Sequence, residues 1–304
     1  MRKVQRLLTS PGDAMLPDNV RMQLPNFERF YGVDFSGAKK AGENLWVAEV
    51  HPRRRGLPRL VALDRMADLC GTADREPVLR RLVEMVADSS TALWGCDFPF
   101  GLPIELFPEG ASWHDHFSFL GEWGEEAYDC GLECVRRATE LFERKHIRRA
   151  TDGEAKAPFD AFHYRMIYQT FYGMRDVIGP LRNTPGTAVL PFQYRKLRTA
   201  KRVLVECCPG SVLKRVGVPH QNYKQPTGGP LTRKRRLTRH TIFEWLTGMV
   251  QLDDRHRRLM MRNPGGDAID AVIAAVGAAD AVARADHRAI ARHPRYRREG
   301  RLFV

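Results

Sequence analysis

Short hydrophobic runs separated by polar, turn-forming segments begin near residue 30 and predict β-strands. The first three runs cover residues 30–36, 45–50 and 59–63, and Gly, Ser, Lys, Arg and Pro are frequent between them. Runs of this length with short connections are typical of strands joined as an antiparallel meander. The sequence therefore predicts three consecutive antiparallel strands at the start of the fold.

A different spacing follows at residues 74–87. Apolar residues there recur at intervals of three and four, which predicts an amphipathic helix. A hydrophobic run at 93–97 comes next and predicts a fourth strand. Because a strand, a helix and a strand in succession normally form a right-handed crossover, we expect the fourth strand to lie parallel to an earlier one.

Residues 98–200 are dense in aromatic side chains and predict a helical insertion with a small core of its own, with helices at about 125–147 and 160–180. The strand pattern resumes at 202–207, and helices are expected at about 211–216, 236–250 and 266–284. Residues 1–25 have no periodicity and predict a flexible N-terminal arm. The predicted core thus comprises residues 26–97 and 201–304.

This element order is that of an RNase H-like α/β domain. We therefore predict a mixed five-stranded sheet flanked by helices and carrying a large helical insertion. In that arrangement the first and fourth strands are neighbours. Asp34 in the first and Asp97 at the end of the fourth would then project toward one cleft.

Other carboxylates fall at comparable places. Glu206 ends the fifth predicted strand, and Asp267 and Asp270 begin the helix at 266–284. A carboxylate inside a core is costly unless it is paired or holds a metal. We therefore predict a catalytic site made of Asp34, Asp97, Asp267, Asp270 and Glu206. The four aspartates are the expected ligands of Mg²⁺ or Mn²⁺, since such ions favour carboxylate oxygens, while Glu206 is equally a candidate ligand and a structural ion-pair partner.

Each acid also has a structural interpretation. Asp34 and Asp97 are compatible with turn-forming roles, and Glu206 with an ion pair to Lys201 or Arg202. Asp267 and Asp270 match an N-cap followed by an acid in the first helical turn, where the helix dipole favours negative charge.

Four short motifs follow one another along the chain. They are Gly32-Val33-Asp34-Phe35-Ser36-Gly37, Cys96-Asp97-Phe98-Pro99-Phe100-Gly101-Leu102-Pro103, Glu206-Cys207-Cys208-Pro209 and Asp267-Ala268-Ile269-Asp270-Ala271. In this order they resemble the motifs of an uncharacterised bacterial and archaeal family of predicted RNase H-like nucleases, distantly related to the Holliday-junction resolvase RuvC. The resemblance extends from about residue 30 to 284, except for the insertion. It implies an RNase H-like fold with a carboxylate-bound metal site.

The charge balance favours a polyanionic partner. The formal net charge is +13, and most of the excess lies after residue 194. Nucleic acid, DNA or RNA, is the commonest such partner. Candidate phosphate contacts are Lys39, Lys40, Arg233, Lys234, Arg235 and Arg236. A compositional drift toward basic residues is the alternative explanation.

Other features limit the setting of the protein. Its six cysteines show no pairing framework, which favours reduced thiols and a cytoplasmic location. No apolar run reaches the roughly 20 residues that a membrane span needs, and the start of the sequence lacks the apolar segment of a secretory signal. We expect no membrane association, and the sequence indicates no obligate protein partner.

The first hypothesis is a nuclease that hydrolyses phosphodiester bonds with two metal ions. A non-catalytic nucleic-acid-binding or scaffold protein of the same fold is the alternative. An ATP-dependent phosphotransferase of the actin-like or sugar-kinase type would also place a strand Asp before a turn of small residues, as at Asp34 to Gly37. Such enzymes repeat the unit, and the sequence shows no second copy.

Overall fold

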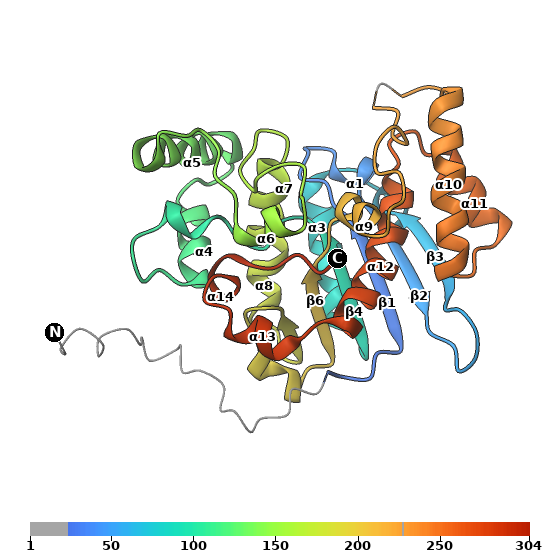
Figure 1. Cartoon of the computed structure of the whole chain (residues 1–304), viewed down its shortest axis with the longest axis horizontal. Coiled ribbons are helices and arrows are strands. Elements are labelled where there is room, and N and C mark those ends of the chain that lie inside the picture. The colour runs from blue at the N-terminus through green and yellow to red at the C-terminus, as the bar shows by residue number, and fades with distance from the viewer. Residues whose placement is uncertain (1–23, 227) are drawn as a thin grey trace.

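A mixed β-sheet runs through the centre of the molecule (Figure 1). The computed structural model describes residues 24–226 and 228–304, so the predicted N-terminal arm lies almost wholly outside the described residues. Within them the sheet has six strands in the order β3-β2-β1-β4-β6-β5. The strands are β1 (Arg29–Asp34), β2 (Trp46–His51), β3 (Arg59–Arg65), β4 (Ala92–Asp97), β5 (Thr187–Val189) and β6 (Arg202–Glu206).

The strand directions follow the connections between them. β1, β2 and β3 pair antiparallel, as the predicted meander requires. β4 returns beside β1 in parallel, because α3 (Arg75–Asp88) provides the crossover between β3 and β4. β6 is parallel to β4, and β5 is parallel to β6. The carboxyl ends of β1, β4 and β6 therefore lie at the same edge of the sheet.

Helices cover both faces of the sheet. Besides α3, the helices of the described residues are α1 (Ala41–Asn44), α2 (Met66–Cys70), α4 (Trp113–Gly121), α5 (Ala127–Phe142), α6 (Ala150–Glu154), α7 (Ile167–Tyr172), α8 (Gly179–Leu181), α9 (Pro209–Arg215), α10 (Arg233–Met249), α11 (Asp254–Arg262), α12 (Asp267–Arg284), α13 (His287–Arg292) and α14 (Tyr296–Glu299). Shorter turns are the 3-10 helices η1 (Ile104–Leu106) and η3 (Tyr194–Arg198) and the π-helix η2 (Gly173–Ile178).

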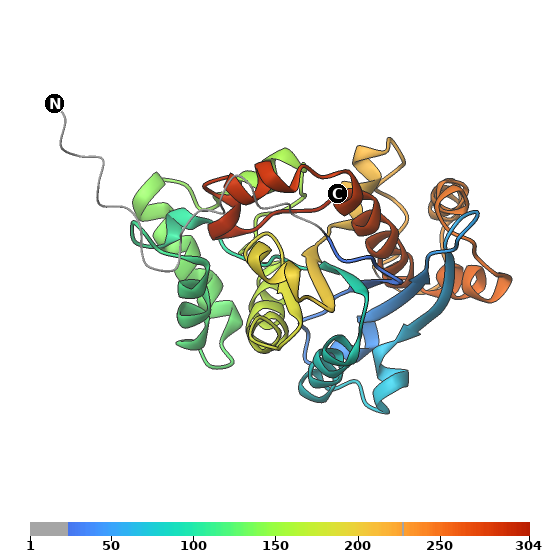
Figure 2. The ribbon, with the colours of Figure 1, turned by 90° about the horizontal axis from the view of Figure 1, so that it is seen from below.

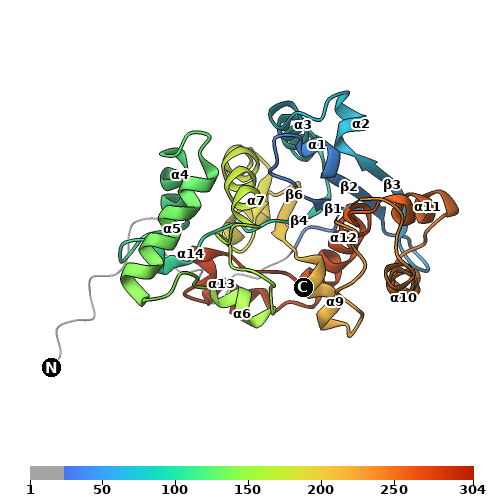
Figure 3. The same ribbon diagram turned by 90° about the horizontal axis from the view of Figure 1, so that it is seen from above.

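The two faces have separate hydrophobic cores. Tyr31, Val33 and Trp94 point to one face, where they pack with α3 and with aromatic residues of the insertion. The opposite face is buried by α12, α9 and α10. Figure 2 shows α3 and α12 on opposite sides of the strands, and Figure 3 places α4 and α5 on the side of the molecule away from β3 and α10. The structure is therefore α/β with three layers.

The structure corrects two features of the predicted architecture. The sheet has six strands rather than five among the described residues, because β5 lies inside the segment 98–200 that was expected to be helical. That segment also lacks a separate core. Its aromatic residues, among them Phe100, Trp113 and Phe119, belong to the cluster that includes Trp94 of β4. The insertion is thus packed onto one face of the sheet.

Candidate metal centre

Gly-x-Asp occurs at the carboxyl ends of two neighbouring strands. Gly32 in β1 lies opposite Gly95 in β4, and Asp34 lies opposite Asp97. Because side chains alternate between the faces of a strand, each aspartate is on the same face as the glycine two residues earlier. Both carboxylates therefore project from the face that α12 covers.

The two glycines let α12 approach the sheet closely. An added Cβ would lie 1.9 Å from the carbonyl oxygen of Ala271 at Gly32, and 2.6 Å from that of Ala274 at Gly95. Any side chain at these positions would therefore push the helix away. The first turn of α12 lies beside the strand ends as a result, and it carries Asp270.

Asp34, Asp97 and Asp270 converge as predicted. One ligand oxygen of each acid lies within 4.8 Å of those of the other two. Asp34 and Asp270 are buried, with 7% and 1% of their surface exposed, and Asp97 is partly buried. The three acids line a cavity of about 700 Å³.

The loop before α10 supplies two further groups. The Tyr223 hydroxyl donates a hydrogen bond of 2.8 Å to one oxygen of Asp270. The Lys224 ammonium forms an ion pair with its other oxygen. The Lys224 side chain remains 44% exposed, whereas the Asp270 side chain that it meets is buried.

Burial and mutual repulsion disfavour three charges in this space. Burial raises the pKa of Asp34 well above its ordinary value, and the neighbouring carboxylates act in the same direction. Burial, reinforced by the charge of Asp270, raises the pKa of Asp97 to about 8. Lys224 opposes both shifts. A divalent cation would relieve the repulsion more fully than one ammonium group. The all-carboxylate donor set therefore fits Mg²⁺ or Mn²⁺.

Asp267 lies at the edge of this cluster. It lines the same cavity, but its Oδ2 atom accepts a hydrogen bond of 3.2 Å from the Asn263 side chain. The N-cap of α12 is Gly266, so Asp267 occupies the first helical turn and is not the capping residue. Burial raises the pKa of Asp267. Its place beside the three acids is compatible with a supporting ligand.

Glu206 is held by an ion pair instead. Arg149 Nη2 donates to its Oε1 at 2.5 Å and Nη1 to its Oε2 at 2.8 Å. The Phe100 backbone amide donates to the same Oε2 at 3.0 Å, and Arg149 also binds Asp152. An ion pair of Glu206 with Lys201 or Arg202 was the alternative prediction from the sequence. Glu206 does form an ion pair, but its partner is Arg149. Glu206 is therefore placed to anchor the insertion to β6.

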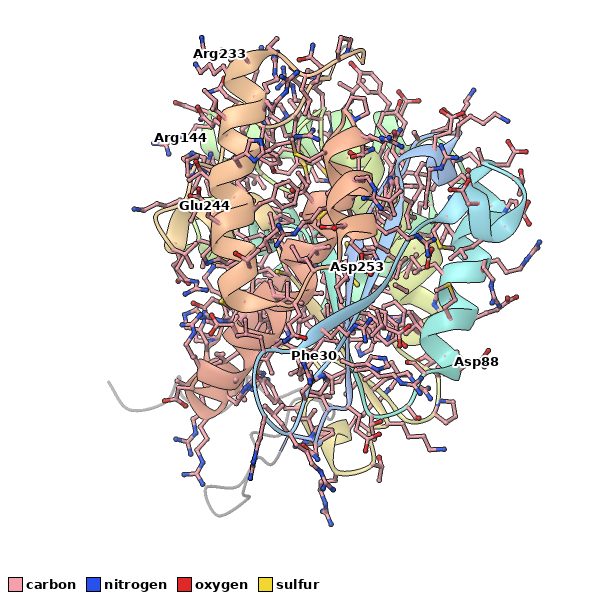
Figure 4. The ribbon with its side chains drawn as sticks, turned by 90° about the vertical axis from the view of Figure 1, so that its right-hand side faces the viewer. Phe30, Asp88, Arg144, Arg233, Glu244 and Asp253 are labelled. Carbon is pink, nitrogen blue, oxygen red and sulfur yellow. The ribbon has the colours of Figure 1, made fainter. Side chains whose placement is uncertain are left out.

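Of the six predicted phosphate contacts, only Arg235 lines the acidic cavity. Lys40 pairs with Asp74 at 2.7 Å on the surface, and Lys39 beside it is exposed. Of the run at the start of α10, only Arg235 lines the acidic cavity, where it donates to Gln225. Figure 4 shows Arg233 at the upper end of the molecule and Phe30, which lies near the start of β1, in its lower half. This run therefore lies toward the carboxyl end of β1.

Sequence reasoning missed four residues of this region. Tyr223 and Lys224 bind Asp270, Arg149 binds Glu206, and Arg165 lines the acidic cavity from the insertion. Single polar residues in loops carry no periodic signal. Only the folded chain shows which acid each of them meets.

The fold and the cluster define an α/β protein with a buried carboxylate site at the edge of a mixed sheet. The family described as "Protein of unknown function (DUF429)" matches residues 32–295. The chain belongs to this DUF429 family. No curated protein and no solved structure matches it. None of the described helices is long and apolar enough to cross a membrane.

Proposed function

We propose that this protein is a metal-dependent nuclease with an RNase H-like fold. The observation that carries the proposal is the convergence of Asp34, Asp97 and Asp270 from three elements to within 4.8 Å. Three ionised carboxylates at such a distance repel one another, and a cation between them removes that repulsion. Their chemistry is suited to Mg²⁺ or Mn²⁺, with Asp267 as a further ligand.

The sheet supports the fold assignment. Three antiparallel strands are followed by a parallel β4 next to β1 and then by β6, which is the strand order expected of an RNase H-like core. β5 adds an edge strand to that core. Asp34 and Asp97 occupy the carboxyl ends of its central strands, where active sites of open α/β sheets are usually found.

The proposed chemistry is hydrolysis of a phosphodiester. Divalent ions at such a site activate water and stabilise the leaving oxygen. Asp34 and Asp97 would hold an ion from the sheet, and Asp270 from the helix. A net charge of +13 supports a nucleic-acid substrate, because basic residues neutralise backbone phosphates.

The test compares charge-removing variants of matched type. Asp34→Asn, Asp97→Asn and Asp270→Asn each remove one ligand, whereas Asp254→Asn makes the same change at an exposed position in α11. We expect Mn²⁺-dependent cleavage of DNA or RNA oligonucleotides by the wild type. Because an ion contributes several kcal/mol to such a reaction, each ligand variant should lose about 10³-fold or more in rate, and Asp254→Asn should lose none.

One observation favours a second candidate, a non-catalytic nucleic-acid-binding or scaffold protein. Lys224 already provides a positive charge to Asp270. If that ion pair is the final state of the site, Mn²⁺ will neither bind nor raise the unfolding temperature, and no form of DNA or RNA will be cleaved. Retained activity in Asp34→Asn would also contradict the metal site.

A further inference from the structure

A second, larger cavity lies beside the acidic one. It has a volume of about 1530 Å³ and is bounded by α3, α5, α7 and the turn after β1. We call it the aromatic groove. Its lining includes Lys39, Arg75, Tyr128, Arg165, Tyr168 and Arg175.

The aromatic groove is continuous with the acidic cavity. Ser36, Arg165 and Gln169 line both. The Gln169 side chain donates a hydrogen bond of 2.8 Å to the carbonyl oxygen of Phe35, the residue after Asp34. A Cβ added at Gly37 would lie 2.1 Å from the Tyr168 carbonyl oxygen. The start of α7 is therefore held directly against the strand that carries Asp34.

Most charged groups of the groove are paired. Arg75 and Arg175 both pair with Glu125, at 2.8 and 2.6 Å. Of the other acids in the lining, Glu76, Glu84 and Asp176 also pair with arginines, and Glu126 has no ion pair among the described residues. Lys39 and Arg165 have no carboxylate partner among residues 24–226 and 228–304, and Arg165 also lines the acidic cavity. Unpaired positive charge is thus present where the groove meets the acidic cavity.

Exposed tyrosine rings also line the groove. Tyr128 of α5 is 50% exposed and Tyr168 of α7 is 42% exposed, whereas most other aromatic residues of the insertion are buried in the core. Tyr164, 60% exposed, lies beside Arg165, whose Nε donates to its hydroxyl at 3.1 Å. Ring faces next to free cations suit unpaired bases and their phosphates.

We propose that the aromatic groove binds an unpaired nucleic-acid strand that leads to the acidic cluster. Lys39 and Arg165 contact phosphates next to the reacting bond, and the bases stack on Tyr168 and Tyr128. A duplex is the poorer fit, because its binding depends mainly on neutralising phosphates, and among the described residues the groove offers two unpaired cations, Lys39 and Arg165. The inference rests on the proposed function for its choice of nucleic acid and adds that the substrate is single-stranded at this point.

Binding without cleavage tests the groove separately from the chemistry. The protein is Asp34→Asn, and the probes are a fluorescent single-stranded oligonucleotide and a blunt duplex of equal length, followed by anisotropy. Tyr128→Ala and Tyr168→Ala should each weaken single-strand binding about tenfold, since one stacked base contributes about that factor. Tyr128→Phe and Tyr168→Phe keep the ring and should bind as the parent does. Duplex affinity should not change.

Leu132→Ala is the matched control, because Leu132 is exposed on α5 but does not line the groove. It should leave both affinities unchanged. Lys39→Gln combined with Arg165→Gln should lower the salt dependence of single-strand binding by up to two phosphate contacts.

Single-strand affinity that is unchanged in Tyr128→Ala and Tyr168→Ala overturns the inference, even if the wild type cleaves with Mn²⁺. A wild type that cleaves nothing, but whose single-strand binding depends on these rings, supports the groove and contradicts the proposed nuclease. If the alanine variants fail to fold, Lys39→Gln combined with Arg165→Gln still tests the inference. A salt dependence of single-strand binding identical to that of the parent also overturns it.

Discussion

Asp270 receives a proton donor on one oxygen and an ammonium group on the other. Tyr223 and Lys224 supply them from adjacent positions in one loop. Burial alone would lower the pKa of Lys224, but the negative charge of Asp270 and its neighbours outweighs burial and raises it well above the ordinary value. Lys224 therefore stays charged at neutral pH. It competes with any metal ion for the same carboxylate.

Replacing Lys224 should strengthen metal binding. Lys224→Met removes the competing charge and should lower the dissociation constant for Mn²⁺ about tenfold, since a nearby cation typically changes the charging of a carboxylate by at least one pKa unit. Isothermal titration calorimetry with Mn²⁺ measures this. Lys145→Met, at an exposed position that does not line the acidic cavity, is the control and should bind as the wild type does. Weaker binding in Lys224→Met would mean that the lysine supports the site instead.

At the scale of elements, the site depends on how closely α12 lies on β1 and β4. Gly32→Ala places a Cβ within 1.9 Å of a helix carbonyl, so α12 must shift and take Asp270 with it. We expect a loss of about 1–3 kcal/mol in the free energy of unfolding and weaker Mn²⁺ binding.

Urea unfolding and Mn²⁺ titration check both effects. Gly248→Ala is the control, because a Cβ at that position in α10 would meet nothing within 4 Å. The control should be neutral or slightly stabilising, as alanine is the better helix former. Unchanged metal affinity in Gly32→Ala would show that the position of α12 does not set the site.

The attachment of α4 to the sheet gives a pH dependence. His116 is fully buried, and its Nδ1 accepts a hydrogen bond of 3.2 Å from the Leu102 amide. Burial, together with the charges of Arg149 and Arg298, lowers the pKa of His116 to about 3. The folded protein therefore keeps this imidazole neutral at pH values where the unfolded chain protonates it. The contribution of His116 to the free energy of unfolding is therefore fully present above pH 6.5 and is lost as the pH falls toward 3.

His116→Asn should remove that dependence while keeping an acceptor for Leu102. Between pH 7 and pH 5 the wild type should lose about 2 kcal/mol more unfolding free energy than the variant. Chemical denaturation at the two pH values measures the difference. Equal losses in both proteins would mean that His116 is protonated in the folded state.

For the molecule as a whole, the sequence predicted part of the fold and part of the candidate site. Strand patterns placed Asp34 and Asp97 at the ends of predicted neighbours, and the pairing of β1 with β4 confirms that they meet. β5 was missed because its three residues are too few to show a period. Glu206 meets Arg149, which is far away in the sequence, so no local pattern identifies that pair. Positions that follow from the alternation of side chains along a strand could thus be predicted from the sequence. Pairs that form only through tertiary contacts could not.

The proposed nucleic-acid binding depends on charges spread over the molecular surface. Replacing Arg233, Lys234, Arg235 and Arg236 with serine should reduce the slope of log affinity against log salt by roughly 0.7 to 0.9 for each lost phosphate contact. The effect should be equal for different sequences, since phosphate contacts carry no sequence information. Fluorescence anisotropy with Asp34→Asn across a salt series is the measurement.

The control removes the same charge at the other end of the sheet. Arg53, Arg54, Arg55 and Arg59 lie at the connection between β2 and β3, which is near the start of β1 and away from Asp34. Their replacement with serine should leave the slope nearly unchanged. Equal slopes in both variants and the wild type would indicate that the basic composition serves no binding surface at either end.

Because α12 carries Asp270 and is made late, the site is completed only near the end of protein synthesis. The ribosome makes β1 and β4 long before α12, so a growing chain carries Asp34 and Asp97 without their partner Asp270. The sheet face with Gly32 and Gly95 also lacks its cover until that helix emerges. We therefore expect the proposed site to stay incomplete until α12 has been synthesised and has packed on the sheet.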